Sequence, residues 1–237
     1  IDGNNNHKKE HLMRFNLYSF NLYIGLVILS FVFLTSPCIA YEQGTWFARI
    51  GPALIEPNDS SNDVEGLANT GVRVDNNVTL GFTIGYMLTS KYAIELLGVT
   101  PSKHDLRGKD GIGALGKIAD VDVFPPTLSL QYHFDGTTKF HPYVGAGINY
   151  THFPDENVSS SLETALGGKT RLDVDDSWGL AVQAGMDYSI NNNWFINTAI
   201  WYVDIEADAT LKTNGVSRDV DIDIDPWVLF TGIGRKF

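Results

Sequence analysis

Three residues, Ser129, His133 and Asp187, are of the types that a hydrolase combines as nucleophile, base and acid. Such residues must lie within hydrogen-bond reach of one another, and no local motif brings these three together. The histidines do not have the HxxxH or HExxH spacing of a metal site. They are His104, His133, His141 and His152. The sequence therefore predicts neither a catalytic site nor a structural metal centre, and it implies no cofactor.

Acidic residues alternate along two neighbouring segments. On each segment the acidic side chains share one face of an extended strand: Asp204, Glu206 and Asp208 on the first, and Asp219, Asp221, Asp223 and Asp225 on the second. Like charges that face each other destabilise an antiparallel pair, so one interpretation is a bound Ca²⁺ or Mg²⁺ ion. The spacing does not match an EF-hand loop. We favour the other interpretation, a water-exposed continuation of the strands, and leave ion binding open.

The chain is acidic, with 17 lysines and arginines against 28 aspartates and glutamates and a net charge of −11. Nucleic-acid binding requires a basic face, so the composition argues against that class of partner. The one cysteine, Cys38, lies in the N-terminal segment, and the rest of the chain therefore has no disulfide framework.

Residues 22–35 form an uncharged apolar run of fourteen residues. A transmembrane helix needs about 20 such residues, so this run suits the core of a signal peptide instead. Small residues stand three positions and one position before Tyr41, as a cleavage site requires. We expect residues 1–40 to be an upstream tail and signal peptide, and residues 41–237 to form one mature domain.

Apolar residues alternate with small or polar ones along this mature segment, with a period of two. The clearest case places Leu80, Phe82 and Ile84 on one face, and Thr83 and Gly85 on the other. The pattern predicts eight strands: 46–55, 78–88, 92–103, 127–134, 143–150, 177–190, 194–208 and 219–237.

Short and long connections alternate strictly between these strands. The short ones are 89–91, 135–139 and 191–193, and the long ones, which we expect to be loops, are 56–77, 104–116, 153–176 and 209–218. Outer-membrane barrels show this asymmetry, with short periplasmic turns and long extracellular loops. The sequence therefore predicts an all-β protein, an eight-stranded antiparallel up-and-down transmembrane β-barrel in the outer membrane of a Gram-negative bacterium.

A soluble eight-stranded barrel is the alternative, and it would place large apolar side chains inside. Here the polar face consists of Gly, Thr, Ser, Gln and Asn, which are small enough for the narrow interior of eight strands. Aromatic residues gather near strand ends, as they do at membrane interfaces. They are Trp46, Tyr86, Tyr132, Tyr150, Trp178, Tyr188, Trp194, Tyr202 and Trp227. We therefore expect the Leu, Ile, Val and Phe face to contact lipid.

Six stretches spread over most of the strands carry a family likeness. They are Glu95-Leu96-Leu97 with Thr100-Pro101, Pro125-Pro126-Thr127-Leu128, 142–150 (PYVGAGINY), Asp176-Ser177-Trp178-Gly179, Trp201-Tyr202-Val203-Asp204-Ile205 and Asp225-Pro226-Trp227. On these stretches the chain resembles the outer-membrane protein W (OmpW) family over essentially all of 41–237. The resemblance implies a narrow, partly apolar lumen that passes small hydrophobic molecules at low conductance, and in some members a receptor for bacteriocins or phage. The expected partners are outer-membrane lipids and lipopolysaccharide, the barrel assembly machinery and small hydrophobic solutes.

Strand parity indicates which residues face the lumen. Glu95 is not expected to face lipid, because a carboxylate in mid-membrane costs about 2–4 kcal/mol or somewhat less. Leu97 shares its face, and on another strand Trp201 shares a face with Asn197. If Leu97 and Trp201 both point inward, they form either an apolar constriction or a plug of a closed core. Trp201 could instead face lipid, because both faces of its strand are apolar.

The last residue, Phe237, closes the final strand and resembles the signal by which outer-membrane barrels are recognised for assembly. The favoured interpretation is a passive barrel and not an enzyme. One alternative is a closed structural or receptor barrel that acts through its extracellular loops. Another is a barrel enzyme that modifies lipid A, which would need an outward-facing Ser/His/acid set at the lipid boundary, and the sequence shows none.

Overall fold

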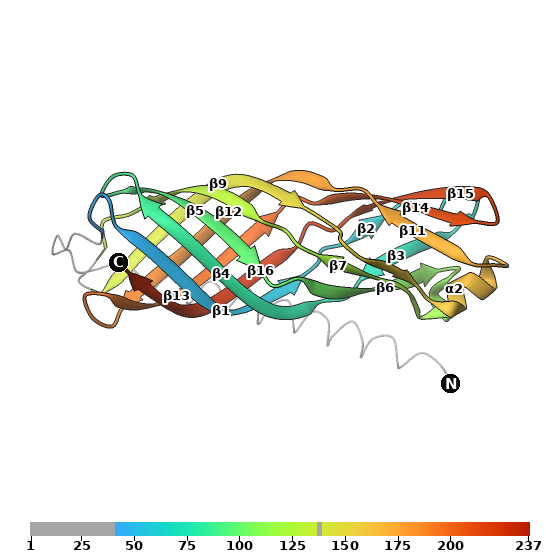
Figure 1. Cartoon of the computed structure of the whole chain (residues 1–237), viewed down its shortest axis with the longest axis horizontal. Helices are drawn as coiled ribbons and strands as arrows, with labels where there is room; N and C mark the ends of the chain where they lie inside the picture. Colours follow the sequence, from blue (N-terminus) through green and yellow to red (C-terminus); the bar gives the residue numbers. More distant parts are fainter. Residues whose placement is uncertain (1–40, 137–138) are drawn as a thin grey trace, which may run out of the picture. The chain divides into compact units, whose positions relative to one another are not determined.

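Eight antiparallel strands close into a barrel in the computed structural model, which describes residues 41–136 and 139–237 (Figure 1). Each strand pairs with its neighbours in sequence order, and the first strand closes the ring against the last. The barrel strands are β1 (Trp46–Glu56), β4 (Asn77–Met87), β5 (Tyr92–Val99), β8 (Thr127–His133), β9 (Phe140–Thr151), β12 (Ser177–Ser189), β13 (Trp194–Val203) and β16 (Trp227–Lys236). The predicted eight-stranded up-and-down barrel is confirmed.

The barrel wall alternates between outward apolar and inward small or polar side chains. In β4, Leu80, Phe82 and Ile84 point outward, with 46%, 42% and 47% of their surface exposed, whereas Gly85 is buried. A Cβ atom at Gly85 would lie 2.1 Å from the ring of Phe47, so glycine is required there for the ring to fit. The interior of eight strands is narrow, and small inner residues make room for the few large ones.

Aromatic side chains form a belt at each end of the barrel. At the end with the short turns, the rings of Trp46 and Tyr86 lie 5.0 Å apart. At the other end, the rings of Tyr150 and Trp178 lie 4.8 Å apart. Amphipathic rings settle at the two interfaces between membrane and water, so the belts mark the height of the membrane-spanning wall.

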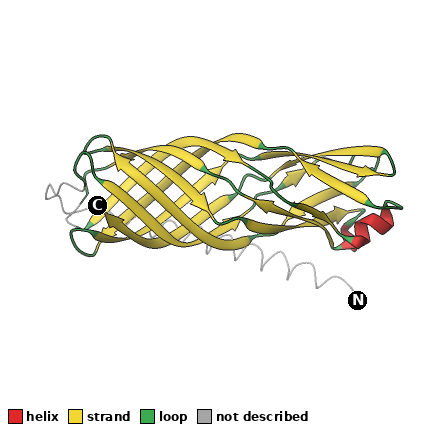
Figure 2. Cartoon of the chain, viewed as in Figure 1, coloured by secondary structure: helices red, strands yellow, loops and turns green. Residues whose placement is uncertain are grey.

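All four long connections contain β-strands and are not simple loops, contrary to the sequence-based expectation, and the adjoining segment 117–123 is a strand as well. Beyond the end of the barrel opposite the C-terminus they form two further antiparallel sheets, which we call the distal sheets (Figures 1 and 2). One contains β10 (Glu156–Val158), β7 (Lys117–Val123), β6 (Ser102–Asp110) and β3 (Thr70–Val74). The other contains β11 (Thr170–Val174), β14 (Glu206–Thr213), β15 (Val216–Asp223) and β2 (Ser60–Ser61). The helix α2 (Ser160–Ala165) and the 3₁₀ turn η1 (Gly113–Leu115) complete this part.

Most of the distal strands were not predicted, because outside the membrane the outward side chains are polar and the inward ones apolar, the reverse of the barrel wall. Outside the membrane, polar side chains face outward: on the outer face Lys103 donates to Asp120 at 2.5 Å. The apolar residues of the same strands, such as Leu106 and Val121, turn inward and are buried. The inner faces of both distal sheets pack into one hydrophobic cluster that continues into the outer half of the barrel.

Three predicted strands run through the boundary between the barrel and the distal sheets, and the structure divides each of them. They are 92–103, 194–208 and 219–237. Pro101 separates β5 from β6, and Pro226 precedes β16. Proline has no N–H to donate to a sheet, so strands end or bend there. Asp225 adopts a left-handed φ of 40°, and its Oδ1 accepts a hydrogen bond from the Ile205 N–H at 3.2 Å, which stabilises the bend.

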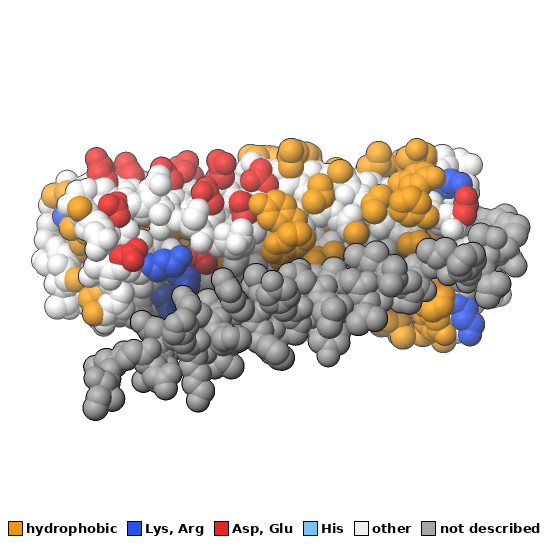
Figure 3. Space-filling model, turned by 180° about the vertical axis from the view of Figure 1, so that it is seen from behind, with side chains coloured by type: hydrophobic (Ala, Val, Ile, Leu, Met, Phe, Trp, Pro, Cys, Tyr) orange, Lys and Arg blue, Asp and Glu red, His pale blue; other side chains and the backbone are white. Residues whose placement is uncertain are grey.

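The two acidic segments pair with each other as β14 and β15. Glu206 lies opposite Asp223 and Asp208 lies opposite Asp221, and all four are exposed. Acidic side chains gather over the distal sheets and apolar ones over the barrel (Figure 3). Asn62 Nδ2 donates to Asp221 at 3.1 Å and relieves part of the repulsion. The predicted water-exposed continuation is confirmed, and within residues 41–136 and 139–237 no cluster of three or more His, Cys, Asp or Glu side chains could hold a metal ion.

The last residue, Phe237, continues the pairing of β16 with β1. The Phe237 N–H donates to the Trp46 carbonyl at 2.8 Å, and the Phe237 side chain is exposed. Its role in assembly stays a prediction. The predicted signal peptide, residues 1–40, lies outside the described residues. Among the residues that are described, no helical segment has the length and apolar character needed to cross a bilayer.

Replacing Phe82 by arginine tests the lipid face. We expect the change to lower the free energy of unfolding by about 2–4 kcal/mol if Phe82 lies near the bilayer midplane, because the charge would enter hydrocarbon. The measurement is urea unfolding of the protein folded in phospholipid vesicles. Val216→Arg is the matched control, since Val216 is an exposed apolar strand residue of the distal sheets. Equal penalties at the two positions would refute the assignment of this face to lipid.

Candidate functional site

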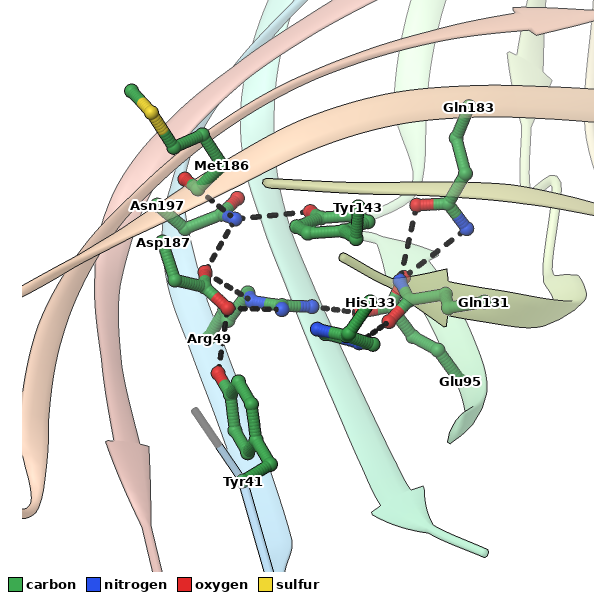
Figure 4. A network of polar contacts seen from close by, with 10 residues as sticks. All are labelled: Tyr41, Arg49, Glu95, Gln131, His133, Tyr143, Gln183, Met186, Asp187 and Asn197. Carbon is green, nitrogen blue, oxygen red and sulfur yellow. Dashed lines mark hydrogen bonds and ion pairs between the residues drawn. The ribbon is translucent and has the colours of Figure 1, made fainter. Parts of the chain in front are cut away.

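An arginine in the barrel interior contacts two carboxylates from other strands (Figure 4). Arg49 lies on β1, Glu95 on β5 and Asp187 on β12. Arg49 donates to Asp187 through Nη2 at 2.9 Å and through Nε at 3.3 Å, and its Nη1 forms an ion pair with Glu95 Oε2. All three side chains are completely excluded from solvent. The planar guanidinium suits this place because it presents donors in several fixed directions.

Neutral side chains complete the hydrogen bonds of Glu95. Gln131 Nε2 donates to Glu95 Oε1 at 2.7 Å, and Gln183 Nε2 donates to the same oxygen at 3.4 Å. Gln131 Nε2 also lies 3.1 Å from Gln183 Oε1, and Gln131 Oε1 lies 3.0 Å from His133 Nε2. Glu95 therefore has hydrogen-bond partners on both carboxylate oxygens, as a buried charge requires.

The carboxylate of Asp187, which lies toward the short turns, also has hydrogen-bond partners on both of its oxygens. Asn197 Nδ2 donates to Asp187 Oδ1 at 2.7 Å and lies 2.9 Å from the Tyr143 hydroxyl. Tyr41 precedes β1, yet its side chain enters the lumen and its hydroxyl donates to Asp187 Oδ2 at 2.5 Å. Figure 4 shows Tyr41 and Asn197 approaching Asp187 from different sides of the barrel.

Aromatic rings surround the guanidinium. The Arg49 Cζ lies 4.5 Å from the ring centroid of Phe47, 4.9 Å from that of Tyr143 and 5.6 Å from that of Phe195. Ring faces carry partial negative charge, so these contacts add cation–π attraction where water is excluded. They also fill the space around the ion pairs with rigid groups.

These side chains together form what we call the polar network: Tyr41, Arg49, Glu95, Gln131, His133, Tyr143, Gln183, Asp187 and Asn197. Each is at most 5% exposed. Because these side chains are packed against one another out of contact with water, the described residues leave no water-filled path along the barrel axis through this layer. The half of the lumen nearer the short turns is closed.

The residues first considered for catalysis do not form a catalytic arrangement. His133 contacts Gln131, and Asp187 binds Arg49, Tyr41 and Asn197. No hydrogen bond joins Ser129, His133 and Asp187 to one another in the described part of the chain.

The predicted lumen residues Glu95, Leu97 and Trp201 are all buried inside the barrel, and the structure gives them different surroundings. Glu95 belongs to the polar network. Leu97 lies two positions farther along β5, and Trp201 lies opposite Gln183 in the pairing of β12 with β13. Both therefore stand next to the polar network on the side of the distal sheets. The Trp201 ring packs edge-on against Phe230 with centroids 6.1 Å apart, whereas Leu97 lines a cavity.

This cavity lies where the barrel meets the distal sheets, and we call it the barrel-mouth cavity. It is narrow, about 60 Å³. Its lining residues are Ile55, Pro57, Val74, Leu97, Val99, Ser102, His104, Leu106, Val121, Val123, Pro125, Thr127, Asn149, Val203, Ile205, Ile224, Pro226 and Val228. None is an acid, a lysine or an arginine. Burial lowers the pKa of His104, which keeps its imidazole neutral at neutral pH, and its Nε2 lies 3.1 Å from Ser102 Oγ.

Backbone pairing is interrupted beside this cavity. The pairing of β5 with β8 ends where Leu97 lies opposite Thr127. The pairing of β6 with β7 begins only where Ser102 lies opposite Val123. Between these points the described residues of the two segments form no ladder pairs. We call this interruption the ladder gap, and four of the residues that bound it also line the cavity.

Proline explains the ladder gap on one side. Phe124 exchanges both backbone hydrogen bonds with His152, and the Pro126 carbonyl accepts from the Tyr150 N–H. Successive residues of an antiparallel strand direct their backbone toward opposite neighbours, so the backbone nitrogen of Pro125 faces β5, while its carbonyl accepts from Asn149 Nδ2 at 3.3 Å. Pro125 has no N–H to donate there, and the pairing stops.

Arg49 and Tyr41 were not foreseen as lumen residues. The only indication in the sequence was a lone arginine inside an otherwise apolar strand, WFARIGPALIE. A charge at mid-membrane height must point inward and find a partner. Tyr41 gave no such indication, because it lies outside every alternating segment.

The apolar belt, the two aromatic belts and the polar-filled lumen define an outer-membrane β-barrel protein. The family model described as "OmpW family" matches residues 42–237, and the chain belongs to that family. It is 40% identical over 215 residues to outer membrane protein W of Vibrio cholerae serotype O1, covering 90% of this chain and 97% of that one. The crystal structure of OprG from Pseudomonas aeruginosa is similar, with a TM-score of 0.76, 38% identity and coverage of 84% and 98%. Outer membrane protein AlkL of Ectopseudomonas oleovorans is 30% identical over 83% of this chain and 84% of that protein. The predicted family and the outer-membrane location are confirmed.

Replacing Arg49 by methionine tests the polar network. Glu95 and Asp187 would stay buried without their cation, so we expect a loss of about 3–5 kcal/mol in the free energy of unfolding. Urea unfolding in vesicles measures the loss.

Two controls accompany Arg49→Met. Arg107→Met removes an arginine of the distal sheets whose contact with Asp75, at 2.5 Å, is partly exposed, and it should cost far less than Arg49→Met because water screens the pair. The triple variant R49M/E95Q/D187N should recover part of the loss, because no buried charge is left unpaired. A loss in R49M no larger than in R107M would contradict the central role of Arg49.

Proposed function

We propose that this chain takes small hydrophobic molecules from outside the cell into the barrel-mouth cavity and releases them sideways through the ladder gap into the membrane. The observation that carries this proposal is the position of the cavity. Its lining has no charged side chain, it adjoins the point where the pairing of β5 with β8 ends, and the polar network lies next to it on the side of the short turns. The two finer points, hydrophobic selectivity and sideways release, are inferred from this geometry.

The lining of the cavity favours apolar solutes. Each Å² of apolar surface removed from water contributes about 25 cal/mol, so a hydrophobic molecule gains on leaving water for the cavity. An ion would lose its hydration and meet no charged side chain in exchange. The cavity therefore selects against ions, in keeping with a barrel of low conductance.

Passage along the barrel axis would require breaking the polar network. A solute moving that way would have to separate Arg49 from Glu95 or Asp187, leaving buried charges unpaired. Among the described residues, the pairing of β5 with β8 has already ended at the ladder gap, so passage there breaks no ladder hydrogen bond between these two strands. The sideways route is therefore the cheaper one, and it ends in lipid, where a hydrophobic molecule is soluble.

Leu97 and Trp201 have a place in this proposal. Leu97 lines the barrel-mouth cavity and Trp201 lies opposite Gln183 of the polar network, so the two would close the cavity on that side and direct the solute toward the gap. This refines the predicted constriction: the two residues would limit the depth of the cavity and not the width of an axial pore.

Placing a charge in the cavity tests hydrophobic passage. Leu97→Asp should lower the uptake of naphthalene by intact cells several-fold, because the carboxylate would have to be desolvated when a solute binds. Val216→Asp, an exposed position of the distal sheets, should leave uptake unchanged. The folded fraction of each variant is checked by heat-modifiable migration. If folded Leu97→Asp protein takes up naphthalene as the unaltered protein does, a closed receptor barrel becomes the better conclusion.

Restoring a donor at the ladder gap tests sideways release. Pro125→Val supplies an N–H directed toward β5, which should extend the pairing and slow naphthalene uptake. Pro126→Val is the matched control, because the Pro126 carbonyl accepts from Tyr150 of β9, so an N–H restored there would face β9 and not β5. Hydrogen exchange of the amides of β5 reports whether the pairing has extended. Extended pairing with unchanged uptake would rule out the gap as the route.

A further inference from the structure

The distal sheets enclose a second cavity, which we call the tip cavity. Strands of both distal sheets and the helix α2 line it, through Val72 of β3, Ile118 of β7, Leu211 of β14 and Leu162 of α2. Its volume is about 160 Å³. Every side chain that lines it is apolar. The labels of Figure 1 place α2 among the distal strands, away from the barrel wall.

A cavity of this kind has a predictable ligand. Protein interiors are normally packed as densely as organic crystals, so a void of this size leaves its lining without partners. An apolar cavity of about 150 Å³ in another protein stays dry and binds benzene or xenon. A compact apolar molecule would supply the missing contacts, whereas a polar molecule would lose its hydrogen bonds to water without compensation.

The cavity meets solvent at one end of α2. Ala165, the last residue of the helix, lines the cavity and is also exposed. The opposite end of the helix is tied to β7: the Ser159 N–H and the Ser161 hydroxyl donate to β7 carbonyls at 2.9 and 3.2 Å. Because Ala165 is the one exposed residue among those that line the cavity, we infer that the mouth lies beside it, at the end of the helix that β7 does not hold.

We propose that the tip cavity is a binding site for compact apolar molecules about the size of a single aromatic ring. The site goes beyond the passage proposed above and does not depend on it, because a molecule can be held here whether or not the barrel transmits it. It would place a hydrophobic ligand on the water-exposed part of a protein whose apolar outer surface otherwise lies in the membrane.

Benzene is the probe for this site. The protein is folded in lipid nanodiscs, and methyl NMR spectra are recorded at increasing aqueous benzene concentrations. We expect saturable shifts of the methyl groups of Leu162, Ile118 and Leu211. Ala165→Trp should obstruct the mouth and weaken this binding at least tenfold. Thr164→Trp is the matched control, because Thr164 is an exposed neighbour on α2 that does not line the cavity, and it should bind as the unaltered protein does.

The outcomes separate the two proposals. Shifts confined to the barrel-mouth residues Leu97 and Val203 would overturn the tip site and leave the passage proposal standing. Equal affinity in the two tryptophan variants would also overturn it. A further outcome is that benzene binds in the tip cavity while Leu97→Asp leaves naphthalene uptake unchanged. That result would support the tip site and contradict only the passage proposal. The heat-modifiable migration of both tryptophan variants confirms that they are folded before titration.

Discussion

The contact of Arg49 with Glu95 and Asp187 sets the arrangement of the whole barrel. The three residues come from β1, β5 and β12, which lie far apart in the sequence and around the wall. Each charge is fully buried, and each is acceptable there only because the others are present. A one-residue slip of any of these strands would turn its charge toward lipid. The ion pairs therefore specify one register as well as filling the lumen.

The two halves of the lumen differ because of this contact. Ion pairs and amides occupy the half nearer the short turns and close the axis. The other half has no charged lining residue and stays apolar. Pro125 interrupts the backbone pairing beside the barrel-mouth cavity. The wall therefore lacks ladder hydrogen bonds where the lumen is most hydrophobic. The proposed sideways release rests on three features that lie together: the apolar barrel-mouth cavity, the polar network that closes the axis, and the ladder gap.

The same alternation of side chains has opposite consequences in lipid and in water. In the barrel the larger apolar residues, such as Phe82, face outward, and the small or polar ones face inward. In the distal sheets, strands such as β6 and β7 bury Leu106 and Val121 and expose charged residues. The change of solvent at the outer aromatic belt reverses which kind of side chain faces outward, and prolines at the boundary allow strands to end and restart there. The acidic ladders of β14 and β15 are the water-facing side of this second arrangement.

The eight barrel strands, their lipid-facing residues and the aromatic belts could be predicted from the sequence, because alternation with a period of two is local and each strand shows it independently. The inward position of Glu95 followed from the cost of a charge in lipid. The partners of Glu95 could not be predicted, since Arg49, Gln131 and Asp187 meet only when the strands close into a ring. The acidic continuation of the strands was predicted, but most of the other distal strands were expected to be loops, because polar residues alone do not distinguish a loop from a water-exposed strand. Tyr41, the ladder gap and both cavities likewise depend on the tertiary structure: each arises from segments distant in sequence that approach one another, and nothing in the local pattern records that approach.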